Sequence, residues 1–420
     1  MFFIKSRLLF NYYFSKYLNR DINLLYLILF SSLVIFFNLL KYETIMLDGY
    51  VWHNLTEDFF GEIGTTDGRH RPLFGFFGFL IHLFIHPIVG LFSQDTVLIS
   101  WRIMNILLFY SCVILSYFSI LKLTNNRVLS YLFSLFVLTS PQLVYSLSLA
   151  VPLLHGFWIF YFSLFLFIDY LHENNLETKR KKLFIYSFII GLLMLGKAHY
   201  NIVFTIFLCS LIRLRSNEVI QGFAFLFIQA IPLALYVLIL NLYGYDYQNY
   251  EFDRSDFSLL DFAYNAFIAN PNLPNSYFGK LMNFIYILTI EPSKMLFKGS
   301  GIVYSYILFA ALIFKLFSLR SLIVLIYYYS TSGILILSSF SLARHAGDFE
   351  PICFFFLAIL IAHIYSKFNS KLLIRNLIII IFFINFFISQ SGIYFTNIHG
   401  VDFESSFPMR FEIFSIFNLY

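Results

Sequence analysis

The sequence LLYLILFSSLVIFFNLL, residues 24–40, decides the class of fold, because it carries no charged side chain from end to end. Further long apolar runs lie at 105–121, 183–195 and 372–388. In hydrocarbon every backbone N–H and C=O must be paired within its own segment, so runs of about 20 apolar residues indicate spanning helices. The runs are continuous and not alternating, which argues against an outer-membrane barrel. The pattern predicts an all-α polytopic membrane protein.

The composition supports this fold class and argues against several functions. The 420 residues are 60% hydrophobic and 12% charged, about half the charged share of soluble domains. The 57 Phe and 30 Tyr residues fit AT-rich codon usage better than an aromatic ligand site. The three cysteines stand singly, which argues against a disulfide framework or a zinc site. Without a GxxxxGKS/T or GxGxxG motif, ATP-driven transport by this chain is not expected.

The apolar segments predict 11 spans in a single transmembrane domain, residues 1–392, followed by an outer tail, 393–420. The predicted spans are 23–40, 101–121, 128–147, 153–171, 183–197, 199–213, 220–242, 301–318, 321–340, 352–366 and 374–392. The segment 73–93 is also apolar, but glycine, histidine and proline residues interrupt it. We therefore expect this segment to lie along the outer membrane interface or to dip into it.

The basic residues predict the topology through the positive-inside rule. Seventeen of the 28 lysines and arginines fall on the side predicted to be cytoplasmic, with only five acids. These basic residues are Lys5, Arg7, Lys16, Arg20, Lys122, Arg127, Lys179, Arg180, Lys181, Lys182, Arg213, Arg215, Lys315, Arg320, Lys367, Lys371 and Arg375. The N-terminus is then cytoplasmic, and the first apolar run is a signal anchor and not a cleaved signal peptide. Segments 41–100 and 243–300 and the polar turn 341–351 face the outer side.

The first outer loop contains a dense cluster of titratable residues, in LDGYVWHNLTEDFFGEIGTTDGRHRPLF at 47–74. Any one of its acids, taken alone, fits ordinary solvated surface. The cluster begins close to a helix end, where a carboxylate can be partly desolvated and so becomes a stronger base. We predict that Asp48 is this base.

Two cations stand near the predicted outer edge of the membrane. Lys197, in GLLMLGKAHYN at 191–201, is costly between apolar stretches unless it reaches water or an anion. Arg344, in SLARHAGDFEPICFF at 341–355, either pairs with its acidic neighbours or forms a bidentate phosphate clamp. Snorkelling and local ion pairing are the alternatives to phosphate binding.

A carboxylate beside phosphate-binding cations suits one reaction at the outer leaflet. An acceptor hydroxyl attacks the anomeric carbon of a sugar carried on a polyprenyl phosphate, and the carboxylate takes its proton. The phosphate leaving group has a pKa of about 6. It therefore needs cations for stabilisation and no protonating acid, and no nucleotide site is required.

The order of short motifs resembles that of the GT-C fold glycosyltransferases over about residues 20–365. LDGYVWHNL resembles the acidic motif of their first outer loop, with Asp48 at the position of the catalytic acid. The motifs that follow in the same order are RHRPLFGFFGFL, Arg102 opening the second span, the SP of LFVLTSPQLVYS, GLLMLGK and ARHAGDFEP. The chain departs from the family pattern at Gly49, where a second acid is usual, and in having no soluble C-terminal domain after the last predicted span.

The resemblance implies an inverting hexosyltransferase, similar to the serotype-converting glucosyltransferases of O-antigen clusters. It would move a sugar from a polyprenyl-phosphate donor to a lipid-linked glycan of the O-antigen or lipopolysaccharide type, on the periplasmic face of the bacterial inner membrane. No cofactor is required, a divalent cation could take part, and the partners are membrane lipids and not nucleic acid. The implied site residues are Asp48 as base, Glu57 or Asp58 for orienting the acceptor or a metal ion, Arg71, Lys197 and Arg344 for the lipid phosphate, and His70, His199 and His345 in secondary roles.

The sequence leaves two other functions open. An O-antigen polymerase would place its essential residues in the later outer segments, 243–300 and 341–351, and would not need the first loop. A lipid-linked glycan flippase or transporter would carry charged residues in the middle of several helices, whereas here the charges cluster at one face. Removal of the Asp48 carboxylate therefore separates the glycosyltransferase from the polymerase.

Overall fold

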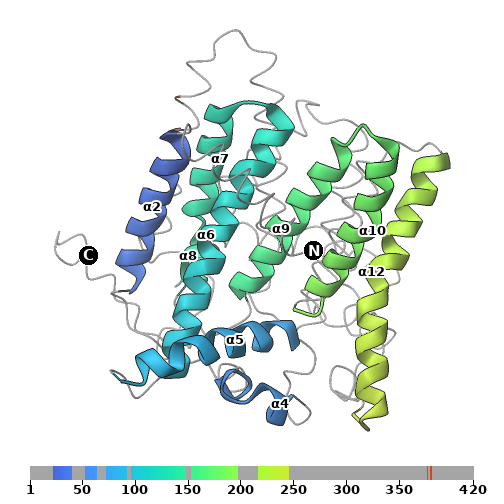
Figure 1. The fold of residues 1–420 in the computed structure, drawn as a ribbon. Helices are drawn as coiled ribbons and strands as arrows, with labels where there is room; N and C mark the ends of the chain where they lie inside the picture. Colours follow the sequence, from blue (N-terminus) through green and yellow to red (C-terminus); the bar gives the residue numbers. More distant parts are fainter. Residues whose placement is uncertain are drawn as a thin grey trace, which may run out of the picture.

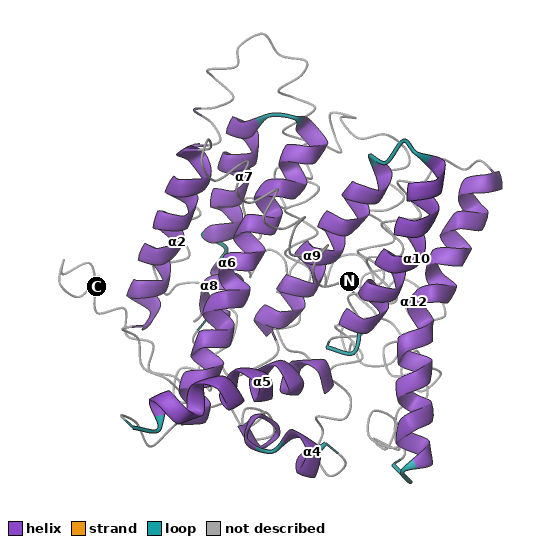
Figure 2. Ribbon diagram, in the orientation of Figure 1, coloured by secondary structure: helices purple, strands orange, loops and turns teal. Residues whose placement is uncertain are grey.

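The computed structural model describes residues 22–39, 53–63, 72–91, 96–147, 153–196, 216–245, 376 and 379–380. Within these ranges the chain is helical, with short turns and no strand (Figure 2). Three helical segments are long and apolar enough to cross a membrane: Pro72–Val89, Thr96–Thr124 and Phe223–Leu242. Shorter apolar helices lie at Ile22–Phe36, Arg127–Leu138 and Leu154–Tyr170. The described part of the chain therefore agrees with the predicted helical membrane protein.

Most of the described helices run roughly side by side as a bundle (Figure 1). These helices are α2 (Ile22–Leu39), α6 (Thr96–Thr124), α7 (Arg127–Leu138), α9 (Leu153–Leu171), α10 (Leu176–Leu193) and α12 (Ser216–Leu242). The short α4 (Phe59–Glu62) and the longer α5 (Pro72–Val89) lie together at one end of the bundle. We call this end the α5 end, and the opposite end, which carries the connections at 125–126 and 172–175 and the first turns of α10, the basic end.

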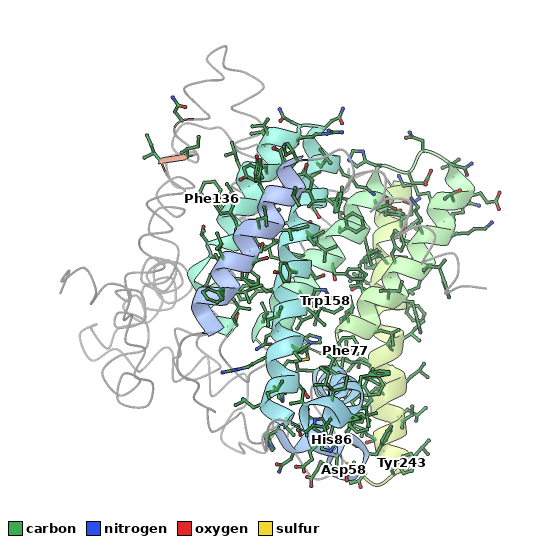
Figure 3. All side chains as sticks on the ribbon, turned by 60° about the vertical axis from the view of Figure 1, so that its left-hand side comes forward. Asp58, Phe77, His86, Phe136, Trp158 and Tyr243 are labelled. Atoms are coloured by element: carbon green, nitrogen blue, oxygen red, sulfur yellow. The ribbon has the colours of Figure 1, made fainter. Side chains whose placement is uncertain are left out.

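The two ends separate the residues as the charge pattern predicted. The helix ends at the basic end carry Lys122 of α6, Arg127 of α7 and the consecutive basic residues 179–182 of α10. The α5 end carries Asp58, His86 and Tyr243, which lie far from Phe136 of α7 in Figure 3. In the described part α6 and α7 run in opposite directions, as do α9 and α10, whereas α10 and α12 both run from the basic end to the α5 end (Figure 1).

Helix α6 lies at the centre of the described bundle and packs against α2, α5, α7 and α9. Small polar side chains on its buried face let neighbouring helices approach closely and exchange hydrogen bonds. Ser116 Oγ donates to Ser134 Oγ of α7 at 3.1 Å. Trp158 Nε1 of α9 donates to Ser111 Oγ at 2.9 Å. These contacts fix the rotation of α7 and α9 against α6.

The segment predicted as one helix at 128–147 is interrupted between α7 and the short α8 (Pro141–Ser146). Proline lacks an N–H and disfavours the helical conformation at the preceding residue, here Ser140. Ser140 Oγ instead accepts the N–H three residues on, at 3.3 Å, and so caps α8. At the other end of α8, Asn105 Nδ2 donates to two backbone carbonyls, at 3.3 Å each.

The other predicted boundaries differ less. The spans at 23–40, 153–171 and 220–242 correspond to α2, α9 and α12, whereas those at 101–121 and 183–197 begin too late. Helix α10 begins earlier because Asn175 Oδ1 accepts two N–H groups of its first turn, at 3.0 and 3.1 Å. The predicted spans at 199–213, 301–318, 321–340, 352–366 and 374–392 lie outside the described residues, apart from 376 and 379–380, which are helical.

Helix α5 crosses the end of the bundle and does not run along it (Figure 1). Its length and hydropathy alone would allow it to span a membrane. Its direction relative to α6 and α9 agrees instead with the expectation that the segment 73–93 lies along an interface. Proline and histidine within the helix, at Pro87, His82 and His86, are the residues that suggested this from the sequence.

Candidate functional site

Two of the predicted site residues, Glu57 and Asp58, belong to the described part of the chain. The others lie outside the described residues, namely Asp48, His70, Arg71, Lys197, His199, Arg344 and His345. The α5 end nevertheless contains the described residues that adjoin several of these in the sequence. It is therefore the part of the structure from which a site can be built.

A helical turn at 53–57 and α4 lie against α5 because α5 presents glycines there. A Cβ at Gly75 would stand 3.1 Å from the Cβ of buried Leu55, and one at Gly78 would stand 2.5 Å from Thr56 Oγ1. The absence of side chains at these two positions permits the close approach. Phe59 completes the packing, with its ring 5.4 Å from that of Phe76.

This packing gives Glu57 and Asp58 different surroundings. Asp58 is the N-cap of α4, and its Oδ1 accepts the N–H of Gly61 at 3.0 Å. Glu57 is exposed, and its negative charge acts favourably on a positive charge at His82 of α5. Asp58 therefore has a structural role that accounts for its position, and Glu57 is the better candidate for contact with a ligand.

The start of α5 and the end of α10 meet through their backbones. The N–H of Leu73 donates to the carbonyl oxygen of Leu195 at 3.4 Å. Each of these residues is two positions in the sequence from a predicted phosphate-binding cation, Arg71 on one side and Lys197 on the other. Two segments that the sequence treats as separate motifs are thus brought to one junction.

Buried His155, in the first turn of α9, lies at this junction. Its ring contacts Phe74 and Phe77 of α5, with centroids 5.3 and 5.5 Å away, and Trp158 at 5.5 Å. Trp158 and Phe77 are labelled close together in Figure 3. A Cβ at Gly196 would stand only 2.6 Å from His155 Nε2. The turn that leads into the GLLMLGK motif therefore rests directly on the imidazole.

A polar seam joins α5 to α6 at the same end. His82 Nδ1 lies 3.2 Å from Ser100 Oγ, and His86 Nδ1 lies 3.0 Å from Thr96 Oγ1. Sequence reasoning had treated the two histidines only as interruptions of an apolar segment. The signal that could have found them is matched spacing. The two histidines stand four residues apart on α5, and Thr96 and Ser100 stand four residues apart on α6, so each pair occupies one face of its helix.

The α5 end thus presents imidazoles, hydroxyls and the exposed carboxylates of Glu57 and Asp58 beside a junction of three helices. Within the described residues, no three His, Cys, Asp or Glu side chains converge to form a complete metal site. Comparison with known protein families, with curated proteins and with solved structures finds no match to this chain.

Proposed function

We propose that the protein is a GT-C-type glycosyltransferase with 11 spans, which moves a hexose from a polyprenyl-phosphate donor to a lipid-linked glycan of the O-antigen type. The α5 end faces the periplasm and the basic end faces the cytoplasm, as the positive-inside rule requires. The reaction then takes place at the outer leaflet of the bacterial inner membrane, and α5 lies along that surface.

The observation that carries the proposal is the junction between α5 and α10. The Leu73–Leu195 hydrogen bond and the contact of Gly196 with His155 hold together the two segments that run into Arg71 and Lys197. A phosphate bound between two cations is stabilised more than by either alone, because each contributes a charge-assisted hydrogen bond. A shared junction is the arrangement that this function needs.

The proposed step balances without a cofactor. The acceptor hydroxyl gives its proton to the Asp48 carboxylate while its oxygen forms the new bond to the anomeric carbon. The bond from that carbon to the phosphate oxygen breaks, and the electron pair leaves with the polyprenyl phosphate. Arg71, Lys197 and Arg344 stabilise the charge that develops on this leaving group. Attack on the face opposite the phosphate inverts the anomeric configuration.

The test uses purified full-length protein in lipid nanodiscs, a panel of polyprenyl-phosphate sugars and a lipid-linked O-antigen acceptor, with products identified by mass spectrometry. We expect the wild type to add a single hexose and Asp48→Asn to lose transfer while remaining folded. Glu177→Gln, the same acid-to-amide change at the basic end, is the control and should transfer like the wild type. Joining of diphosphate-linked repeat units into longer chains would instead identify a polymerase.

A second variant tests the junction itself. A Cβ at Gly196 must displace the His155 ring or the turn, so we expect Gly196→Ala to lower transfer by roughly 10–100-fold, the cost of misplacing a binding group by about 1 Å. Gly191→Ala is the matched control, since it disturbs the contact of α10 with α12 and not the junction. Equal activity per folded molecule in the two variants would contradict a role for the junction in binding.

A further inference from the structure

The histidines of the polar seam lie one helical turn apart on the face of α5 that meets α6. Their ring centroids are 4.9 Å apart. His82 is 7% exposed and His86 is exposed, so the pair extends from the protein interior to its surface. Both rings direct Nδ1 toward a hydroxyl of α6. The two imidazoles are therefore oriented alike by one partner helix.

The hydrogen bonds assign the tautomer of His82. Ser100 Oγ has one proton, which it donates to the carbonyl oxygen of Thr96 at 2.7 Å. Its contact with His82 Nδ1 therefore requires a proton on that nitrogen. A neutral imidazole protonated on Nδ1 has its lone pair on Nε2. Nε2 of His82 is consequently a ligand atom and not a donor.

This arrangement is that of metal-binding histidines. In such sites one ring nitrogen binds the metal, and the other donates to a neighbouring acceptor that fixes the ring. Two histidines at i and i+4 on a helix reach the same ion, as they do in the HExxH motif. Nitrogen–zinc bonds of about 2.0–2.1 Å with near-tetrahedral geometry put two ring centres about 5 Å apart. The 4.9 Å spacing of His82 and His86 matches this value.

The surroundings keep the His82 ring neutral, because burial and then the charge of His86 lower its pKa, and Glu57 opposes them only in part. A neutral imidazole is the form that binds a metal ion. Imidazole nitrogens select zinc, copper and nickel over magnesium and calcium, which prefer oxygen ligands. The described residues supply two ligands here and no converging third one, so water or oxygen atoms of a bound molecule complete the coordination. Such a site is open to an additional ligand.

We propose that His82 and His86 form a two-imidazole site for a divalent late-transition-metal ion, bound through both Nε2 atoms at the seam between α5 and α6. This inference does not depend on glycosyl transfer, because it rests on the ring geometry and the hydroxyl partners alone.

The test titrates detergent-purified full-length protein without a histidine tag. Zn²⁺ affinity is measured by competition with a fluorescent chelator, and Cu²⁺ binding by pulsed electron paramagnetic resonance, which counts coordinated imidazoles. We expect one site with two imidazoles in the wild type. His86→Ala, a change at an exposed position, should weaken Zn²⁺ binding at least tenfold and leave at most one imidazole on Cu²⁺.

Two further variants make the result specific. Ser100→Ala removes the hydroxyl that orients His82, and we expect a loss of about 10–100-fold in affinity with both imidazoles retained. His172→Ala, at an exposed position of the basic end, should bind like the wild type. The proposal is overturned if His86→Ala keeps wild-type Zn²⁺ affinity, or if Cu²⁺ on the wild type shows fewer than two imidazoles.

Discussion

Asp169, at the end of α9, anchors three helices at the basic end, and its replacement by asparagine should destabilise the whole bundle. Its carboxylate accepts from Lys122 Nζ of α6, from Lys182 Nζ of α10 at 2.7 Å and from Tyr186 OH at 2.8 Å. The Asp169→Asn variant keeps the shape of the side chain and removes the charge. It leaves Lys122 facing a neutral group in a partly buried position, whereas Lys182 retains Glu173 at 2.9 Å.

The size of the effect follows from burial. Breaking a fully buried ion pair costs about 3–5 kcal/mol, and exposed pairs contribute about 0.2–1 kcal/mol. The side chains are 17% exposed for Asp169 and 22% for each lysine. We therefore expect a loss of about 2–3 kcal/mol, between these limits and nearer the buried one. At roughly 2 °C per kcal/mol for a large chain, Tm should fall by about 4–6 °C.

Thermal unfolding in detergent, followed by intrinsic fluorescence, measures this change. Glu177→Gln is the matched control, because Glu177 pairs with Lys181 at 2.6 Å but the two side chains are 78% and 69% exposed. Its Tm should stay within about 1 °C of the wild type. High salt should abolish any effect of Glu177→Gln and leave that of Asp169→Asn, since buried pairs are screened less. Equal Tm values for the two variants would refute the reasoning.

Three other perturbations have defined outcomes. The hydrogen bond from Lys182 lowers the pKa of Glu173. Burial disfavours the charge of Lys182, but the hydrogen bonds that Lys182 donates to Asp169 and Glu173 raise its pKa. Tm should therefore fall as pH drops below 4.5 through the lowered pKa of Glu173, and again as pH rises above 10.5 through the raised pKa of Lys182. Lys182→Met should flatten both sides of this curve of Tm against pH. Gly191→Ala places a Cβ 2.4 Å from a backbone carbonyl of α12, so we expect a loss of about 1–3 kcal/mol in thermal unfolding. Gly78→Ala should loosen the 53–57 turn through the Thr56 hydroxyl, and faster backbone hydrogen exchange in that turn, with α9 unchanged, is the measurement.

The sequence predicted the helices well where burial is uniform and poorly where a polar side chain sets a boundary. The run at 153–171 corresponds to α9 residue for residue, because a buried apolar segment ends where its side chains become polar. The break near Pro141 and the early start of α10 depend on local hydrogen bonds. Hydropathy averages do not register such bonds, although Pro141 and Asn175 are both legible as signals in retrospect.

For the site, sequence reasoning named residue types but not their neighbours. Motif order suggested Arg71 and Lys197, but the backbone hydrogen bond between Leu73 and Leu195, which joins the segments next to them, follows from no spacing rule. The histidine pair was visible in the sequence and was interpreted only as a break in hydrophobicity. Asp58 and Glu57 looked equivalent, and the N-cap of α4 distinguishes them. Tertiary contact, and not residue identity, made each of these differences.

Helix α5 lies across the end of the bundle although it is long and apolar enough for a span (Figure 1). Its residues satisfy the length and hydropathy of a span, but its sides have different partners. The glycine face receives the 53–57 turn, the histidine face pairs with hydroxyls of α6, and a third face exposes Phe84 and Ile88. A spanning helix in that environment would have to break the Leu73–Leu195 contact and both histidine contacts. The polar partners therefore hold α5 across the bundle, and its exposed apolar stripe is the side that a membrane surface would take.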